Sequence, residues 1–442
     1  MDSGTLQIQS PASISGQGHS TRTGQTFLYF GLLTIFTSLA LPDGPLVDIQ
    51  TSYMLKNQLN ANATQISMFR LLTAVPLYFA FAFGLTRDLW NPFGLRDRGY
   101  FLIFAPVIAI VFIWLATSHL SYRGLMIGMF LAIFASQFVG AASGALMALL
   151  GQEKLMSGRL SVLGYVVGSV LGVISAFASG YISNHLRPGA AFVLAAGFAC
   201  GICLLGFWKP RAVFNGTYDK PQAIGAGFRA DVKRLLKHRA IYPAVLISFL
   251  WAFAPGAQTP LQFYLTNELH ASDAVFSYYK GIFSAAFIPT LLLYGFLCKR
   301  VALNKLLWWG TIVAVPQMIP LAFVHSANLA LAMAVPIGLL GGMATAAYMD
   351  LAMRSCPAGL QGTLMMLVLA VLSLSARGGD LLGSAIYNSS PKHGFLYCVI
   401  ATTAVYALIL PLILLVPKAL IATMDGEASG TRKRGTSEFY EA

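Results

Sequence analysis

Residues 101–118 read FLIFAPVIAIVFIWLATS, a segment without a charged residue and apolar on every side of a helix. About 20 apolar residues in a helix suffice to cross the hydrocarbon core of a bilayer. A strand of a membrane β-barrel would instead alternate apolar and polar side chains. The segment therefore predicts a membrane-spanning α-helix.

Further apolar segments of similar length lie on both sides of this one. The composition agrees, since 57% of the 442 residues are hydrophobic and 10% are charged, whereas soluble domains carry about 25% charged residues. We therefore predict an all-α membrane protein with twelve transmembrane helices, and we exclude a soluble enzyme. The predicted spans are 27–54, 65–86, 101–118, 125–150, 159–182, 189–208, 241–266, 274–298, 305–325, 328–353, 360–387 and 391–418.

The spans divide six and six around a polar, basic stretch. A trace of duplication supports two related bundles, because GAASGALMALLGQEKLMSG (140–158) aligns without gaps with GGMATAAYMDLAMRSCPAG (341–359). Parallel repeats of this kind are one known transporter design. The predicted parts are a disordered cytoplasmic tail (1–26), an N-terminal six-helix bundle (27–208), a cytoplasmic linker (209–239), a C-terminal six-helix bundle (240–418) and a cytoplasmic tail (419–442).

The basic residues predict the orientation. Of 29 Lys and Arg residues, 22 fall in the tails, the linker and the loops on one side of the membrane, and four fall on the other side. Because cytoplasmic loops collect Lys and Arg, we expect both termini in the cytoplasm, most simply across a cell's inner membrane. The same distribution accounts for the net charge of +13 without a nucleic-acid partner. Anionic membrane lipid can contact the basic linker.

Six charged residues lie inside the central-to-outer part of the predicted spans. A charge at this depth costs about 2.5–3.5 kcal/mol on insertion scales, so it calls for a partner or for water. One interpretation is a polar cavity between the bundles that attracts a charged substrate. The alternative is a set of salt bridges that hold the two bundles together. The six residues are Asp43, Asp48, Arg70, Lys280, Arg377 and Asp380.

Other residues in the spans suggest how the helices bend and pack. The string LPDGP (41–45) should break the first helix, because proline cannot donate a backbone hydrogen bond. Glycines at four-residue spacing, at 164, 168 and 172, allow helices to approach closely. Asp350 lies near the cytoplasmic end of its span, where we expect it to pair with Arg354. Candidate neutral residues lining a cavity are Gln137, Gln258, Gln262, Tyr348 and Trp251.

The loop after the second span reads FGLTRDLWNPFGLRDRGY (83–100). Its glycine and acid, followed by basic residues, resemble the loop signature of the major facilitator superfamily. The longer spacer with PFG, and the segment CPAGLQGTLMMLVLAVLSLSARGGDLLGSAIY (356–387), resemble the folate–biopterin transporter branch of that superfamily. The positions in the second span and the following loop that fall near this branch's pattern are Pro76, Gly84, Asp88, Pro92, Phe93, Gly94, Arg96 and Tyr100.

The chain also departs from the branch's pattern. Ala80 and Phe81 replace its Lys-Pro pair, and Gln361 replaces an acid. In the second half the matching string is GFLCK (295–299), where a cation replaces the acid of the first. The resemblance implies that the first-half motif is a cytoplasmic charge relay that stabilises one access state. Its residues would be Gly84, Arg87, Asp88, Arg96 and Arg98.

These observations predict a secondary active transporter, a symporter or an antiporter. It would move a small, anionic organic solute by alternating access of two bundles. We expect Arg70, Lys280, Arg377 and Asp43 to bind the substrate. Protons would couple through Asp43, Asp48 or Asp380, because burial raises the pKa of a carboxyl group. We expect a monomer, the family's usual state.

Two other classes of function stay open. Relatives of the superfamily resemble non-transporting membrane assembly factors, for which the midline should be dry and every charge paired. An integral-membrane enzyme is disfavoured, because the sequence has no HExxH or GxSxG motif and no clustered nucleophile and base, and the absence of GxxxxGK[ST] disfavours an ATP-driven pump. We therefore expect no catalytic residues, no metal site and no cofactor.

Overall fold

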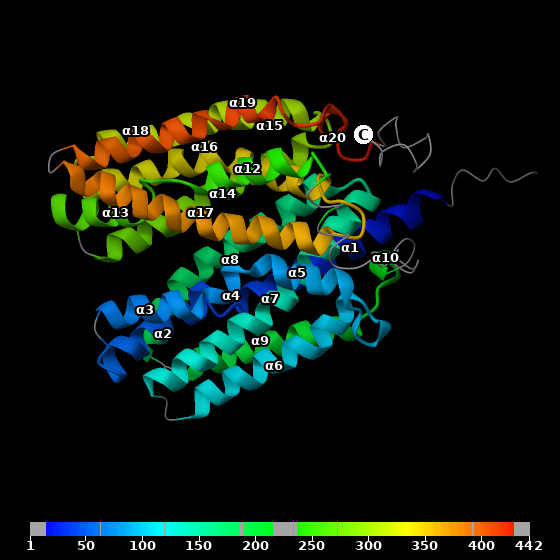
Figure 1. The fold of residues 1–442 in the computed structure, drawn as a ribbon, viewed down its shortest axis with the longest axis horizontal. Helices are drawn as coiled ribbons and strands as arrows, with labels where there is room; N and C mark the ends of the chain where they lie inside the picture. Colours follow the sequence, from blue (N-terminus) through cyan, green and yellow to red (C-terminus); the bar gives the residue numbers. More distant parts are fainter. Residues whose placement is uncertain are drawn as a thin grey trace, which may run out of the picture.

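The computed structural model is all-helical over the residues that it describes, which are 15–61, 63–118, 121–185, 189–214, 233, 237–271, 273–390 and 393–427. The chain forms two halves that lie side by side (Figure 1). Each half has its own hydrophobic core. One core gathers buried side chains between Tyr29 and Phe214, and the other gathers side chains between Ala244 and Ile421, joined by Val162.

The helices of the first half run in chain order from α1 to α10. They are α1 (Ser15–Leu39), α2 (Pro45–Tyr53), a π-helical turn (Met54–Gln58), α3 (Ala63–Thr73), α4 (Val75–Tyr78), α5 (Ala80–Leu89), a 3-10 turn (Pro92–Gly94), α6 (Asp97–Thr117), α7 (Tyr122–Glu153), α8 (Ser157–His185), α9 (Gly189–Phe207) and α10 (Arg211–Phe214).

The second half repeats this pattern. Its elements are α12 (Ile241–Ala252), α13 (Thr259–Phe263), a π-helical turn (Tyr264–Glu268), α14 (Asp273–Leu297), α15 (Leu303–Ala314), a 3-10 segment (Val315–Phe323), α16 (Ala327–Arg354), α17 (Gln361–Ser389), α18 (Gly394–Ala407), α19 (Ile409–Ile413) and α20 (Lys418–Ile421).

Nine helical stretches within the described residues are long and apolar enough to cross a membrane. The other three predicted spans, 27–54, 65–86 and 241–266, are each divided into shorter helices. The predicted break at LPDGP is confirmed, because α1 ends at Leu39 and α2 begins at Pro45. We did not predict the breaks at Pro76 and at Pro255, where proline again removes a backbone donor.

The break in the seventh span repeats the break in the first. In both halves a short helix continues directly into a π-helical turn. The first of these helices, α2, begins at a proline, and the second, α13, begins one residue before a proline. A residue with positive φ then reverses the chain, Asn60 (φ 49°) in the first half and His270 (φ 50°) in the second. This shared local geometry supports the duplicated unit indicated by the sequence.

The structure extends beyond the predicted tail boundaries. Helix α1 begins at Ser15, within the stretch 1–26 that the sequence assigns to a cytoplasmic tail. Thr26 is fully buried and accepts a hydrogen bond from Lys154 Nζ at 3.0 Å, so tertiary contacts extend the helix past the apolar segment. Residues 419–427, predicted to belong to a tail, also pack on the fold. Residues 1–14, most of the linker and 428–442 lie outside the described residues.

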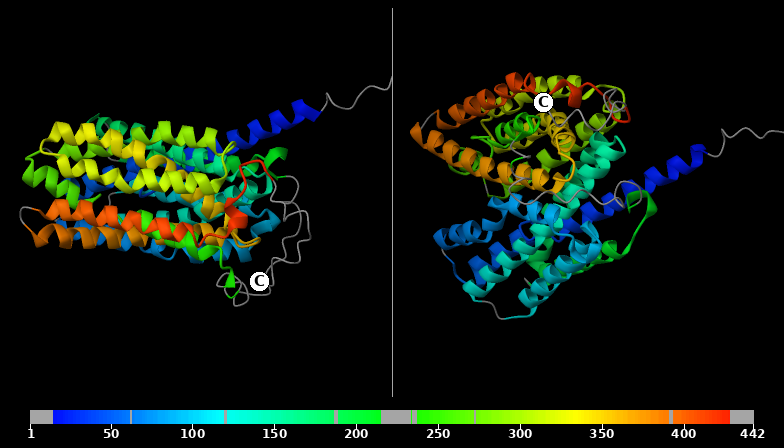
Figure 2. Two further views of the ribbon diagram at one scale, coloured as in Figure 1. Left: turned by 90° about the horizontal axis from the view of Figure 1, so that it is seen from above. Right: turned by 45° about the vertical axis from the view of Figure 1, so that its right-hand side comes forward.

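The halves meet near one end of the bundle. We call it the basic end; it carries the loops 90–96, 154–156, 298–302 and 355–360. Across the halves, α5 packs on α17 and α8 packs on α14. Towards the opposite end, α3 packs on α7 and α2 packs on α8 and α9, all within the first half. The view from above shows the red C-terminal segment at the basic end (Figure 2, left).

Candidate functional site

The first-half charges predicted to line a cavity are accessible in the structure. Arg70 on α3 donates from Nη2 to Asp48 Oδ2 on α2 at 3.4 Å, with side chains 52% and 44% exposed. Such an exposed ion pair adds little to stability. Asp43 lies in the break between α1 and α2 and is also exposed. These charges are therefore available to a solute rather than sealed in a core.

The second-half cations face the same region. Lys280 on α14 and Arg377 on α17 are both exposed. Lys280 is within electrostatic range of Asp48, Arg70, Arg377 and Asp380, and Asp43 is within range of Asp48 and Arg377. The fold thus brings together all six charges that we predicted to meet.

Neither second-half cation is neutralised by a salt bridge within the described part of the chain. Lys280 Nζ lies 4.5 Å from the ring centroid of Phe276, a cation–π contact, and no carboxylate there is within ion-pair distance of Lys280 or Arg377. A cation without a carboxylate at ion-pair distance attracts an anion. The region can therefore bind an anionic group.

Asp380 has a different environment from the other charges. Its Oδ1 accepts a hydrogen bond from the backbone N–H of Thr259 at 2.8 Å, and its Oδ2 accepts one from Thr259 Oγ1 at 2.7 Å. Thr259 is the first residue of α13, so the carboxylate binds the start of the outer half of the broken seventh span. Asp380 thereby ties α17 to α13 in this structure.

A small hollow, with room for about one water molecule, lies closer to the basic end. It is lined by Tyr165 of α8 in the first half and by residues of α12, α16 and α17 in the second. Trp251 packs edge-on against Tyr348, with ring centroids 5.3 Å apart. Tyr348 and Trp251 were predicted to line a cavity. The other lining residues are Ser248, Thr345, Met349, Ala352, Val368 and Leu372.

The pocket is aromatic and uncharged. The Tyr348 hydroxyl is bonded to Thr311 Oγ1 at 2.8 Å. The Tyr165 hydroxyl has no hydrogen-bond partner among the residues with described side chains, so it can bond to a bound molecule.

The predicted gating motif lies at the basic end. Arg87 at the end of α5 is buried and binds Asp97 through two hydrogen bonds, Nε to Oδ1 at 2.5 Å and Nη2 to Oδ2 at 2.6 Å. Its Nη1 also donates to Asp88 Oδ1 at 2.8 Å. Asp97, which is fully buried at the start of α6, was not among the residues predicted for this motif.

Asp88 connects the two halves. Its carboxylate accepts hydrogen bonds from Gly362 N (3.1 Å), Thr363 N (2.7 Å) and Thr363 Oγ1 (2.6 Å) at the start of α17. The first N–H groups of a helix have no partner within the helix and carry positive partial charge, so an anion there is stabilising. A Cβ on Gly84 would clash with the carbonyl oxygen of Gly362, so this close approach requires glycine at 84.

The structure places two predicted relay residues elsewhere. Arg98 donates to the carbonyl oxygens of Gly206 (2.8 Å) and Phe207 (3.1 Å) at the end of α9, not to Asp88. The backbone N–H of Arg96 donates to Asn91 Oδ1 at 2.6 Å and helps shape the loop. Arg98 thus interacts favourably with the negative end of a helix dipole.

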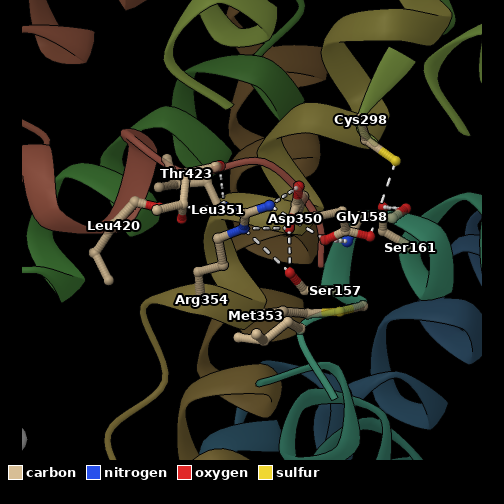
Figure 3. Close-up of polar contacts among 12 residues, drawn as sticks. Ser157, Gly158, Ser161, Cys298, Asp350, Leu351, Met353, Arg354, Leu420 and Thr423 are labelled. Atoms are coloured by element: carbon tan, nitrogen blue, oxygen red, sulfur yellow. Dashed lines mark hydrogen bonds and ion pairs between the residues drawn. The ribbon is translucent and has the colours of Figure 1, made fainter. Parts of the chain in front are cut away.

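A second polar cluster joins the halves beside α8 (Figure 3). Asp350 is fully buried and binds Arg354, with Nε donating to Oδ1 at 2.9 Å, as predicted. Ser157 at the start of α8 donates to the same oxygen at 2.6 Å, and Tyr294 donates to Oδ2 at 2.9 Å. Of the side chains that could ligate a metal, the described ones form no group of three or more.

Comparisons with known proteins agree with this architecture. The family model described as Major Facilitator Superfamily matches residues 24–379. A folate-biopterin transporter from Synechocystis sp. is 23% identical over 74% of this chain and 68% of its own length. Sugar efflux transporter B from Salmonella typhimurium is 22% identical over 58% of this chain and 65% of its own. Folate transporter 1 from Plasmodium falciparum is 20% identical over 64% and 56%.

Solved structures share the fold at lower identity. The human organic anion transporter MFSD10 superposes with a TM-score of 0.64 at 16% identity, over 92% of this chain and all of that one. The transporter FucP gives the same TM-score and identity, over 89% and 98%. These relatives are membrane transporters and not enzymes. On the match of the family model over most of its length, the chain belongs to the major facilitator superfamily and is a multi-pass membrane transporter.

Proposed function

We propose that the protein is a secondary active transporter of small organic anions that works by alternating access. The observation that carries the proposal is the exposed pair Lys280 and Arg377, which have no carboxylate at ion-pair distance among the described residues. A permanent cation at this depth costs free energy. An anionic solute that binds there offsets this cost.

Names of relatives support an anionic solute. Two of the three curated relatives are named for folate or folate and biopterin, and one structural neighbour is named an organic anion transporter. The relative named for sugar efflux supports a neutral solute instead. The exposed cations Lys280 and Arg377 favour an anion over a neutral sugar.

Alternating access is supported by where the halves touch. The polar contacts of Asp88 and of Asp350 join the halves at the basic end, whereas the charged residues near the opposite end are exposed. We place the basic end on the cytoplasmic side of a cell's inner membrane, as the distribution of Lys and Arg indicates. The state in which the halves touch at the basic end is then the outward-facing state. One chain supplies both halves, so a monomer is sufficient for the cycle.

Proton coupling is the remaining part of the proposal. Asp43 and Asp48 are accessible carboxyls beside cations, where charge neutralisation would alter solute binding. Asp380 would act through Thr259, because protonation of its carboxyl weakens the bond to α13. Transport by Asp43→Asn and Asp48→Asn should lose its dependence on a pH gradient. An unchanged dependence in both variants would remove these residues from the coupling step.

The alternative, a non-transporting assembly factor of the same fold, requires paired charges and a dry midline. The exposed Lys280 and Arg377 argue against it. A factor of that kind would bind no small solute and would not respond to changes at either cation.

A binding assay on the purified protein tests the proposal. Thermal-shift measurements with a panel of ring-containing carboxylates and neutral sugars should select an anion. Lys280→Ala and Arg377→Ala should each weaken its affinity at least tenfold, while Arg123→Ala, an exposed cation at the start of α7, should not. Selection of a sugar, or unchanged anion affinity in both cavity variants, would contradict the proposal.

A further inference from the structure

The acid missing from the second gating motif has a substitute elsewhere in the chain. In the first half, Asp88 follows Gly84 and binds the start of α17 in the other half. The corresponding string of the second half ends in Lys299, an exposed cation that can offer no such bond. The start of α8 would then lack its counterpart of Asp88.

Asp425 fills this position in space. Its carboxylate accepts hydrogen bonds from the backbone N–H groups of Gly158 (3.2 Å) and Arg159 (3.1 Å), the second and third residues of α8. Asp88 binds the N–H groups of Gly362 and Thr363, the second and third residues of α17. In each half, therefore, a carboxylate binds the first N–H groups of a helix in the other half.

The glycines repeat the symmetry. A Cβ on Gly158 would lie 2.9 Å from Asp350 Oδ2 and 3.2 Å from Cys298 Cβ. A Cβ on Gly362 would lie 2.8 Å from Asp88 Oδ1. Both helix starts thus carry a glycine close to side chains of the opposite half, although the acid nearest to Gly158 is Asp350 and not Asp425.

Asp425 is anchored to the second half while it binds the first. Its backbone N–H donates to Cys298 O at 2.9 Å, at the end of α14, and Arg354 Nη2 donates to its Oδ1 at 3.3 Å. Arg354 also holds the segment through Thr423 O at 2.9 Å (Figure 3). The side chain of Asp425 is 1% exposed and also accepts from Arg159 Nε at 3.2 Å.

We propose that residues 418–427 are a working part of the basic-end gate, in which Asp425 replaces the motif acid lost at position 299 and holds α8 against the second half. When the basic end opens, α8 moves away from α14 and α16, so the bonds from Gly158 and Arg159 to Asp425 break. The segment therefore favours the state with the basic end closed. The inference rests on the alternating-access cycle proposed above, and its test needs no substrate.

Cys356 is a native reporter of the gate. It lies in the loop between α16 and α17, is 6% exposed and packs against Ala148 of the first half. Burial raises the pKa of its thiol, so the thiolate that reacts with a maleimide is scarce while the gate is closed. The alkylation rate of Cys356 by N-ethylmaleimide, in purified protein whose other four cysteines are replaced by alanine, reports opening at the basic end.

Asp425→Asn should raise this rate at least tenfold. Glu427→Gln, an exposed acid of the same segment, should leave it unchanged. Adding Lys299→Asp to the Asp425→Asn protein should bring the rate back towards that of the parent, because the acid then returns to the motif position. Parent-like rates for Asp425→Asn would overturn the proposal, and so would an equal increase for Glu427→Gln.

A second variant covers the case in which Asp425→Asn does not yield a monodisperse protein. Asp425→Glu keeps the charge but moves the carboxylate by one methylene, and should raise the alkylation rate about two- to threefold. No change with Asp425→Glu would then overturn the proposal. Because neither result depends on a bound solute, failure to find a transported anion leaves this test intact.

Discussion

Gly84 offers the sharpest test of the contact between α5 and α17. In Gly84→Ala the new Cβ would lie 2.7 Å from the carbonyl carbon of Gly362 and 2.9 Å from Thr363 Cα. Carbon atoms pack comfortably at about 3.5–4.0 Å, so the two helices must move apart by roughly 1 Å. The hydrogen bonds of Asp88 to Gly362 and Thr363, now 2.6–3.1 Å, would then exceed a useful length.

The free-energy cost of Gly84→Ala is large because the new Cβ meets backbone atoms, which cannot rotate away as a side chain can. Overpacking that shifts backbone costs about 1–3 kcal/mol, and here that cost falls on the state in which the basic end is closed. A difference of this size corresponds to a shift of about 5- to 150-fold towards the open state. The substituted residue touches no cavity charge, so the intrinsic affinity for a solute in the outward-facing state should not change.

Electron-spin distance measurements can detect the shift. Nitroxide labels at Phe93 and Lys305, both exposed at the basic end, would report a longer distance in Gly84→Ala. Gly168→Ala on α8 is the matched control, because a Cβ there meets nothing within 4 Å. A distance distribution in Gly84→Ala equal to those of wild type and Gly168→Ala would refute the reasoning.

Three further substitutions test the polar contacts. Thermal denaturation in detergent, monitored by circular dichroism, measures the effect of each on stability. Asp97→Asn removes the main partner of the buried Arg87 and should cost about 3–5 kcal/mol. Asp380→Asn weakens the cap of α13 and should cost about 1 kcal/mol, an effect that Thr259→Ala should largely remove when the two are combined. Arg98→Ala leaves two carbonyls of α9 without their donor and should cost about 1–3 kcal/mol. Parent-like melting in any of them contradicts the role assigned to that contact.

Hydropathy predicts those parts of the fold that depend on local composition. Uninterrupted apolar runs became continuous helices, as in 97–117, and the prolines of LPDGP broke the first span. The breaks at Pro76 and Pro255 also occur at prolines. Hydropathy does not predict them, because the residues around both prolines are apolar. Burial of Thr26 likewise extends α1 into residues that a composition argument assigns to a tail.

Glycine spacing alone does not show where helices meet. A Cβ at Gly168 or Gly172 would meet nothing within 4 Å, although their spacing suggested close packing. The close approaches between the halves occur at Gly84, Gly158 and Gly362 instead. Gly158 and Gly362 lie at helix starts, and Gly84 lies in the middle of the short helix α5, so no periodic pattern identifies them.

The charged residues of the cavity could be predicted as a group, because an ion inside an apolar span is stable only beside a partner or water. Their individual partners could not. Asp97 is the first residue of α6 and reads as an ordinary loop acid, yet it is the strongest partner of Arg87. Pair assignments depend on which elements the fold brings together, and the sequence carries no local signal of that.

Asp425 shows the same limit for the gating motif of the second half, whose acid cannot be located from the local sequence. What the start of α8 requires is a carboxylate within hydrogen-bond distance of its free N–H groups, and any segment that passes there can supply it. The first half supplies the acid from the loop next to the crossing helix, and the second half supplies it from a segment more than 120 residues later in the chain. The cation at position 299 is therefore no sign that the second gate contact has been lost. In the structure the contact is present, and the motif acid has changed its place in the sequence while keeping its place in space.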